Sequence, residues 1–289
     1  EPVIGGYMAE APIEMWEMQL AFAIGLLGIY AGWRGTIAKM TGFYDLSGAV
    51  RTLLFGLVAG VIAASVIDLM VLRSIREGTA NILSVSLIAM IIAMAESAFA
   101  LFILGRPNTV GLRASPPYGW TLGLGFGAMR SAHLNVRLFD PEVWQGTTGF
   151  GITNVIFGCL LTITICVGHA SASAWQGYRI LENDRLRAYL KSALSRAILV
   201  IVTVLSVFEP LTLLLIAPIV LISWFPNIKI LISIISRIGE GAGCQVPYLC
   251  ISHVHVHIPP PSPSLYSCTY TRIHAYPYPP FGFPCRSRA

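Results

Sequence analysis

The chain has 289 residues, of which 55% are hydrophobic and only 11% are charged. Soluble domains carry about 25% charged residues, so this composition excludes an ordinary soluble globular protein. The formal net charge of +5 is small and is spread over the predicted loops, which argues against a nucleic-acid-binding surface. We therefore expect an integral membrane protein whose principal partner is the lipid bilayer and that binds no nucleic acid.

The N-terminal segment, residues 1–17, contains four glutamates and no lysine or arginine. Glu10, Glu14 and Glu17 are spaced so that they could share one helical face, for which a solvated face is the favoured interpretation. We expect this segment to lie on the extracytoplasmic side of the membrane.

Apolar segments of membrane-spanning length follow the acidic start. About 20 apolar residues are needed to cross about 30 Å of hydrocarbon. The apolar block at 193–236 is too long for one crossing, and Glu209-Pro210 interrupts it, because proline breaks or kinks a helix. We predict two crossings in this block. The complete set of predicted membrane helices is 18–33, 49–72, 82–105, 117–135, 149–175, 193–209 and 211–236.

The loops between these segments predict the orientation of the bundle. Alternate loops hold nine Lys and Arg residues on one side of the membrane and three on the other. The side richer in basic residues is usually cytoplasmic. We therefore expect an all-α, polytopic transmembrane helix bundle over residues 18–238, with six or seven crossings and the N-terminus outside. We expect such a multi-pass protein to lie in the plasma membrane.

Small residues recur at intervals of four in two of the predicted helices. This spacing lets helix backbones approach closely inside a membrane, which predicts a tightly packed bundle. The residues concerned are Gly56, Gly60 and Ala64 in the second helix, and Gly119, Gly123 and Gly127 in the fourth.

Glu96 is the only charged residue in the predicted helix 82–105. An ionisable side chain at the centre of a membrane helix costs about 2.5–3.5 kcal/mol on insertion scales, so it usually faces the bundle interior and has a function. Ala89, Ala93 and Ala100 share its helical face, so a neighbouring helix can approach it closely. The alternative is a protonated Glu96 that only hydrogen-bonds another helix.

His169 is the candidate partner of Glu96. Glu96 precedes Leu104 by eight residues, or about 12 Å of helix rise, and His169 precedes Tyr178 by nine, or about 13 Å. If both helix ends lie at the cytoplasmic interface, the two side chains lie at similar depth. The alternative is a packed, hydrogen-bonded histidine without a chemical role.

Charged residues near the predicted outer ends of two helices favour structural roles. Asp68 lies on the small face of its helix, a turn from Arg73, which favours capping or ion pairing. Arg130 and His133 follow the glycine-rich ridge toward the outer side. We expect Arg130 to reach the membrane surface or to neutralise Asp68, and to serve structure rather than catalysis.

The C-terminal segment, residues 239–289, differs from the rest in composition. From Cys244 onward it holds nine of the 18 prolines, four of the six histidines and four of the six cysteines. Such a Pro-rich composition does not build a packed core, so we expect a disordered or artefactual tail. His253, His255 and His257 lie near Cys244 and Cys250, but their spacing matches no standard zinc pattern.

The segment from Glu96 to Gly127, together with His169, resembles the PrsW family of polytopic membrane proteases, which is similar to the CAAX proteases. That family carries Glu-Glu-x-x-Lys/Arg in one membrane helix, then Tyr-Gly-x-x-x-Gly-Leu-Gly-Phe leading into Glu-Asn, and later a His with a Gly eight residues on. Glu96 matches the second Glu of the first motif. The other matches are Tyr118, Gly119 and Gly123-Leu124-Gly125-Phe126 for the second motif, and His169 with Gly177 for the third.

The chain also departs from the family pattern. Ala95 replaces the first Glu, and Phe99 replaces the basic residue of that motif. Arg130-Ser131 stands where Glu-Asn is expected. The resemblance covers roughly residues 90–180 and implies either an intramembrane peptidase with an altered site or an inactive relative.

Two catalytic residues follow from the resemblance. In an active enzyme, Glu96 would be the general base that activates water, and His169 would orient it or stabilise the oxyanion, with the use of a metal ion left open. The substrate would be a membrane protein. This hypothesis predicts that Glu96 and His169 approach within about 3–5 Å on a cavity open to the cytoplasm. The alternatives are a proton-coupled transporter, with Glu96 as the titrating group, and a non-catalytic membrane scaffold.

Overall fold

The computed structural model describes residues 13–39, 45–78, 81–105, 115–140, 149–208 and 211–222. The chain divides into two units, Glu1–Val246 and Pro247–Ala289, and all described residues belong to the first. The predicted crossing beyond residue 222, the C-terminal segment 239–289 and its histidines lie outside the described residues.

Each described secondary-structure element is a helix. Helix α2 is extended by a π-helical stretch, Asp68–Leu72, and by the short helix α3, Arg73–Arg76. A short apolar helix, Leu211–Ile222, follows α7. The long helices are α1 Met15–Gly35, α2 Leu46–Ile67, α4 Ile82–Leu104, α5 Ser115–Phe139, α6 Ile152–Leu181 and α7 Arg185–Phe208.

Five of the helical segments are long and apolar enough to cross a membrane: Met15–Lys39, Leu46–Leu72, Ile82–Leu104, Ile152–Leu181 and Arg185–Ser206. Helix α5 is not among them, although the sequence predicted a membrane helix there. Its position explains this difference, since 21 of its 25 residues are buried against other helices. A helix that is surrounded by protein does not need an apolar surface towards lipid.

The turn between α6 and α7 is much shorter than the sequence indicated. We expected a loop over 176–192, but α6 continues to Leu181 and α7 begins at Arg185. Asn183 adopts a left-handed backbone conformation with φ 59°, which asparagine tolerates better than most residues and which ends the helix. The basic residues predicted in a loop therefore lie on helices, among them Arg187 and Lys191.

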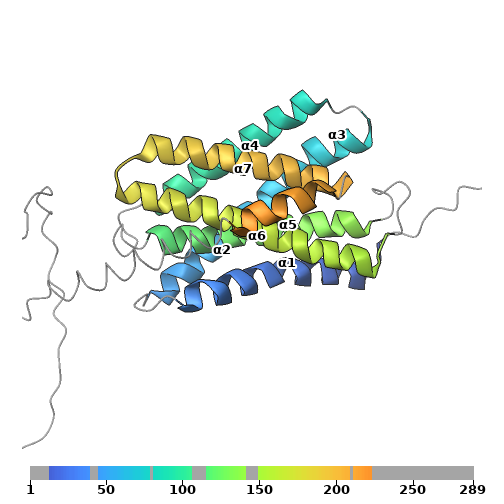
Figure 1. The fold of residues 1–289 in the computed structure, drawn as a ribbon, viewed down its shortest axis with the longest axis horizontal. Coiled ribbons are helices and arrows are strands. Elements are labelled where there is room, and N and C mark those ends of the chain that lie inside the picture. Colours follow the sequence, from blue (N-terminus) through green and yellow to red (C-terminus); the bar gives the residue numbers. More distant parts are fainter. Residues whose placement is uncertain are drawn as a thin grey trace, which may run out of the picture. The chain divides into compact units, whose positions relative to one another are not determined.

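The helices pack around α5 (Figure 1). Helix α5 contacts α6, α2 and α1, whereas α4 packs mainly against α7, and α7 also contacts α6. In Figure 1, α4 and α7 lie along one side of the group formed by α2, α5 and α6, and α1 lies along the other. Polar side chains of α4 and α7 meet those of α5 and α6 where these two groups of helices join.

The glycines of α5 allow this close packing, as their spacing predicted. A Cβ atom at Gly123 would lie 2.3 Å from the carbonyl oxygen of His169, and one at Gly125 would lie 2.4 Å from that of Leu53. Both distances are far below van der Waals contact. The helix therefore touches the backbones of α6 and α2 on opposite sides, and the contact at Gly123 positions His169 beside α5.

Large apolar side chains cover the outer faces of the bundle. Leu54, Val58 and Ile62 on α2 are 54%, 63% and 62% exposed, and Ile91 on α4 is 58% exposed. Glu96, by contrast, is buried. Apolar side chains outside and charged side chains inside are the arrangement expected of a protein surrounded by lipid.

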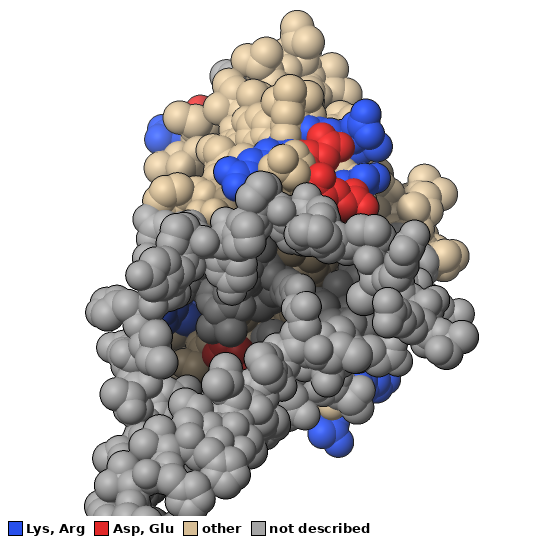
Figure 2. All heavy atoms as spheres, turned by 90° about the vertical axis from the view of Figure 1, so that its left-hand side faces the viewer, with Lys and Arg blue, Asp and Glu red and all other residues tan. Residues whose placement is uncertain are grey.

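The end of the bundle at the α6–α7 turn carries charged side chains of both signs (Figure 2). Arg179 pairs with Glu182, and Arg187 lies 3.5 Å from Asp184. A hydrogen bond from Tyr178, with the Arg179 guanidinium, lowers the pKa of the Glu182 carboxyl. These charges suit an aqueous interface.

Candidate functional site

Four helices bring charged and polar side chains together in the interior of the bundle. Helix α4 provides Glu96, α5 provides Arg130, α6 provides His169 and α7 provides Arg196. Their exposed fractions are 4%, 2%, 0% and 0% in that order. This group, which we call the buried charge cluster, is closed to solvent in the conformation described.

Arg130 binds both residues that the sequence singled out. Its Nη2 donates a hydrogen bond to Oε1 of Glu96, and the two side chains form an ion pair. Its Nη1 lies 2.8 Å from Nε2 of His169. The guanidinium therefore links α4 to α6 through α5.

The contact with Arg130 determines the tautomer of His169. A guanidinium has only donors, so Nε2 of His169 must be the acceptor in this hydrogen bond. The ring proton then lies on Nδ1, which is 3.8 Å from Oε2 of Glu96. Neither Nδ1 nor Oε2 has a hydrogen-bond partner among the described residues.

The expected approach of Glu96 and His169 is therefore present, since 3.8 Å lies within the predicted 3–5 Å. The expected cavity open to the cytoplasm is absent at this pair in the described conformation, because both side chains are almost completely buried. Arg130 and the helices around the pair close it off from water.

Arg196 is the second buried cation of the cluster. Its Nη2 donates to Oγ of Ser173 at 2.6 Å, and its Nη1 lies 3.5 Å from Oγ of Ser97. The guanidinium also lies over the ring of Phe126, with Cζ 5.4 Å from the ring centroid. These partners are neutral, so Arg196 adds a positive charge to the cluster without adding a carboxylate. The cluster therefore contains two arginines and one carboxylate.

Further hydrogen bonds extend from the cluster towards the α6–α7 turn. Gln176 donates to the backbone oxygen of Ser97 at 2.8 Å, and Ser192 donates to the side chain of Gln176 at 3.1 Å. Towards the opposite end, Asn135 donates to Thr162. Thr162 is seven residues, about 10 Å, from His169, and no hydrogen bond between described side chains joins the two groups. Among the described side chains, the hydrogen bonds around the cluster and those of Asn135 and Thr162 therefore form two separate groups.

The expectation that Arg130 reaches the membrane surface or neutralises Asp68 is wrong. Arg130 points into the bundle, and Arg137, two turns further along α5, takes the place beside Asp68. Arg137 donates to both carboxylate oxygens of Asp68, at 2.9 and 2.6 Å, and His133 lies 3.4 Å from it. Arg73 instead pairs with Glu77. The packing of α5 against its neighbours decides which arginine meets Asp68, and sequence spacing does not give that packing.

Sequence reasoning did not include Arg196 among the site residues. The predicted helix began at 193, so Arg196 fell within its first turn. Because α7 begins at Arg185, Arg196 lies eleven residues, about 16 Å, inside the helix. An arginine within an apolar run was the signal that could have identified it.

A metal ion has no evident ligand set in the described part of the chain. Within it, no group of three or more His, Cys, Asp and Glu side chains is arranged to hold a metal. The cluster instead places two guanidinium groups, Arg130 and Arg196, near its single carboxylate and imidazole.

Comparison of the chain with protein-family models, curated proteins and solved structures finds no match.

Proposed function

We propose that the protein is a multi-pass membrane protein and a non-hydrolytic relative of the PrsW-like intramembrane peptidases. In this proposal the buried charge cluster joins helices and does not cleave peptide bonds. The observation that carries the proposal is the double contact of Arg130, which occupies Oε1 of Glu96 and Nε2 of His169 at the same time.

The convergence of three motif positions supports the relationship to PrsW-like proteins. Glu96, Arg130 and His169 stand at the positions where that family carries a Glu, a Glu-Asn pair and a His. Arg130 is 34 residues from Glu96 and 39 residues from His169 in sequence, yet its side chain contacts both. The contacts that bring these three positions together support the relationship.

The contacts of Arg130 argue against hydrolysis. A general base must reach the attacking water with a free lone pair, and a peptide carbonyl must approach a donor that stabilises its oxyanion. Oε1 of Glu96 and Nε2 of His169 are both engaged by Arg130, and the remaining atoms, Oε2 and Nδ1, face each other at 3.8 Å. Both side chains are almost completely buried, so neither water nor a peptide reaches Oε2 unless the helices around the cluster rearrange.

We also propose six or seven crossings, with the α6–α7 turn on the cytoplasmic side of the plasma membrane and the N-terminus outside. The long helices alternate in direction, so the C-terminus of α1 and the α6–α7 turn share an end. That end carries Arg34, Lys39, Arg179 and Arg187, and cytoplasmic ends are usually rich in such residues.

Reconstitution in vesicles with membrane-spanning reporter peptides tests the non-hydrolytic role. Mass spectrometry of the peptides should detect no more cleavage by the wild-type chain than by Glu96→Gln or His169→Asn. Glu77→Gln, which changes an exposed acidic residue, serves as a matched control. Cleavage by the wild type and by Glu77→Gln that is lost in the two site variants would show an active peptidase and overturn the proposal.

A further inference from the structure

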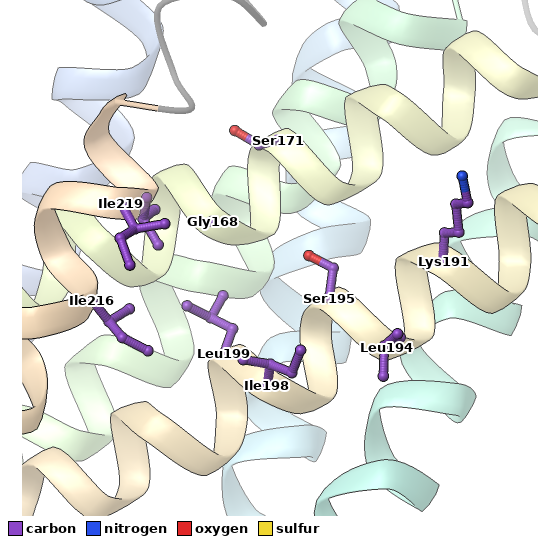
Figure 3. Close-up of a pocket in the computed structure, with 10 residues that line it drawn as sticks. Gly168, Ser171, Lys191, Leu194, Ser195, Ile198, Leu199, Ile216 and Ile219 are labelled. Atoms are coloured by element: carbon purple, nitrogen blue, oxygen red, sulfur yellow. The ribbon is translucent and has the colours of Figure 1, made fainter.

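An open groove of about 620 Å³ lies between α6, α7 and the short helix Leu211–Ile222 (Figure 3). It is separate from the buried charge cluster, because Gly168 and Ser171 of α6 line it, whereas His169 and Ser173 point to the other side of that helix. The groove therefore faces the surroundings of the bundle.

The walls of the groove are apolar along most of their length. Leu194 and Ile198 on α7 are 53% and 51% exposed, and Ile219 on the short helix is 67% exposed. From Lys191 to Leu199 the groove follows α7 over eight residues, or about 12 Å. A flexible hydrocarbon chain fits a surface of this length and composition.

One end of the groove is cationic. Figure 3 shows Lys191 at the opposite end of the groove from Ile216 and Ile219. The Lys191 ammonium lies 5.8 Å from the centroid of the Trp175 ring. Among the described residues, no carboxylate lies within ion-pair distance of Lys191, whereas the neighbouring cation Arg179 pairs with Glu182.

We propose that this groove binds an anionic phospholipid, with an acyl chain along Leu194, Ile198 and Ile219 and the phosphate group at Lys191. Lys191 is six residues, about 9 Å, from the start of α7, where a lysine can extend its ammonium group towards the lipid headgroups. An apolar wall that ends at a cation with no carboxylate partner among the described residues complements a lipid that has both a hydrocarbon chain and a negative charge. The proposal does not depend on the absence of peptidase activity.

Native mass spectrometry of the detergent-solubilised full chain tests this proposal. Two lipids with the same oleoyl chains, phosphatidylglycerol and phosphatidylcholine, are titrated separately. We expect phosphatidylglycerol to bind about five-fold more tightly, the effect of one basic residue at a membrane surface. Lys191→Gln should remove this difference, and Lys39→Gln, which changes another exposed lysine at the same end of the bundle, should preserve it.

A second variant localises the hydrocarbon chain. Ser195 lines the groove and is exposed, so Ser195→Phe should fill the groove without disturbing the core and should weaken binding of both lipids. Equal binding of the two lipids by the wild type would overturn the proposal, as would equal losses in Lys191→Gln and Lys39→Gln. Unchanged lipid binding by Ser195→Phe would also overturn it, and competition by glycerol phosphate as effective as that by the lipid would show that the headgroup alone is recognised.

Discussion

The guanidinium of Arg130 on α5 is paired with the carboxylate of Glu96 on α4 in the interior of the bundle. Helix α4 otherwise packs mainly against α7 and has few contacts with α5. The pair therefore connects α4 and α7 to the helices that surround α5. An isolated charge inside a membrane protein is costly, and here each charge compensates the other.

The two buried arginines should differ in their importance for stability. Arg130→Met leaves the Glu96 carboxylate unpaired, and breaking a buried pair in this way typically costs about 3–5 kcal/mol. Arg196→Met removes a buried cation whose hydrogen-bond partners are hydroxyl groups, so it should cost much less or should stabilise the protein. Equilibrium unfolding in detergent measures both changes. A larger loss for Arg196→Met than for Arg130→Met would show that Arg196, rather than Arg130, neutralises Glu96.

The tautomer of His169 provides a spectroscopic prediction. Because Arg130 donates to Nε2, the proton of the imidazole should lie on Nδ1. Nitrogen-15 NMR of histidine-labelled protein in detergent distinguishes the two ring nitrogens, and His169→Asn assigns the signal by difference. We expect the bound proton on Nδ1 in the wild type. A proton on Nε2 would be incompatible with the Arg130 contact.

The presence and approximate position of the apolar helices could be predicted from the sequence, because length and hydropathy determine them. Five of the expected crossings correspond to long apolar helices. The alanines on the helical face of Glu96 predicted that a neighbouring helix packs there, and Glu96 is buried. A similar depth for Glu96 and His169 could be predicted from the sequence, whereas their contact was expected only from the peptidase hypothesis. Depth is set by the rise of a helix, which varies little between proteins.

The partners of the arginines could not be predicted in the same way. Arg130 and Arg137 are two turns apart on α5, and only the packing of that helix decides which of them meets Asp68 and which meets Glu96. Arg196 was missed because the start of α7 was placed eight residues too late. Helix rotation and helix ends depend on tertiary contacts, to which hydropathy is insensitive.

The close approach of α5 to α6 predicts a steric effect at Gly123. Gly123→Ala places a Cβ atom 2.3 Å from the backbone oxygen of His169 and 2.5 Å from the Cα atom of Ala170. The helices must separate, and such overpacking costs about 1–3 kcal/mol. Thermal unfolding in detergent should show this loss.

A matched glycine on α6 serves as the control for this measurement. The atoms nearest to a Cβ atom at Gly168 belong to the side chain of Leu199, the closest at 2.6 Å, and this flexible side chain can move. Alanine is also favoured over glycine inside a helix by about 1 kcal/mol. Gly168→Ala should therefore be nearly neutral. Equal losses for the two variants would contradict backbone contact between α5 and α6.

The coupling energy between Glu96 and Arg130, measured by a double-mutant cycle, tests the role of this pair most directly. Unfolding free energies of the wild type, Glu96→Gln, Arg130→Met and the double variant define it, and the exposed pair Arg73–Glu77 gives a matched control cycle. We expect a coupling of about 1–3 kcal/mol in favour of the intact buried pair, and much less for the exposed pair. Additive effects of Glu96→Gln and Arg130→Met, with no coupling, would contradict the conclusion that Arg130 holds Glu96 in the bundle.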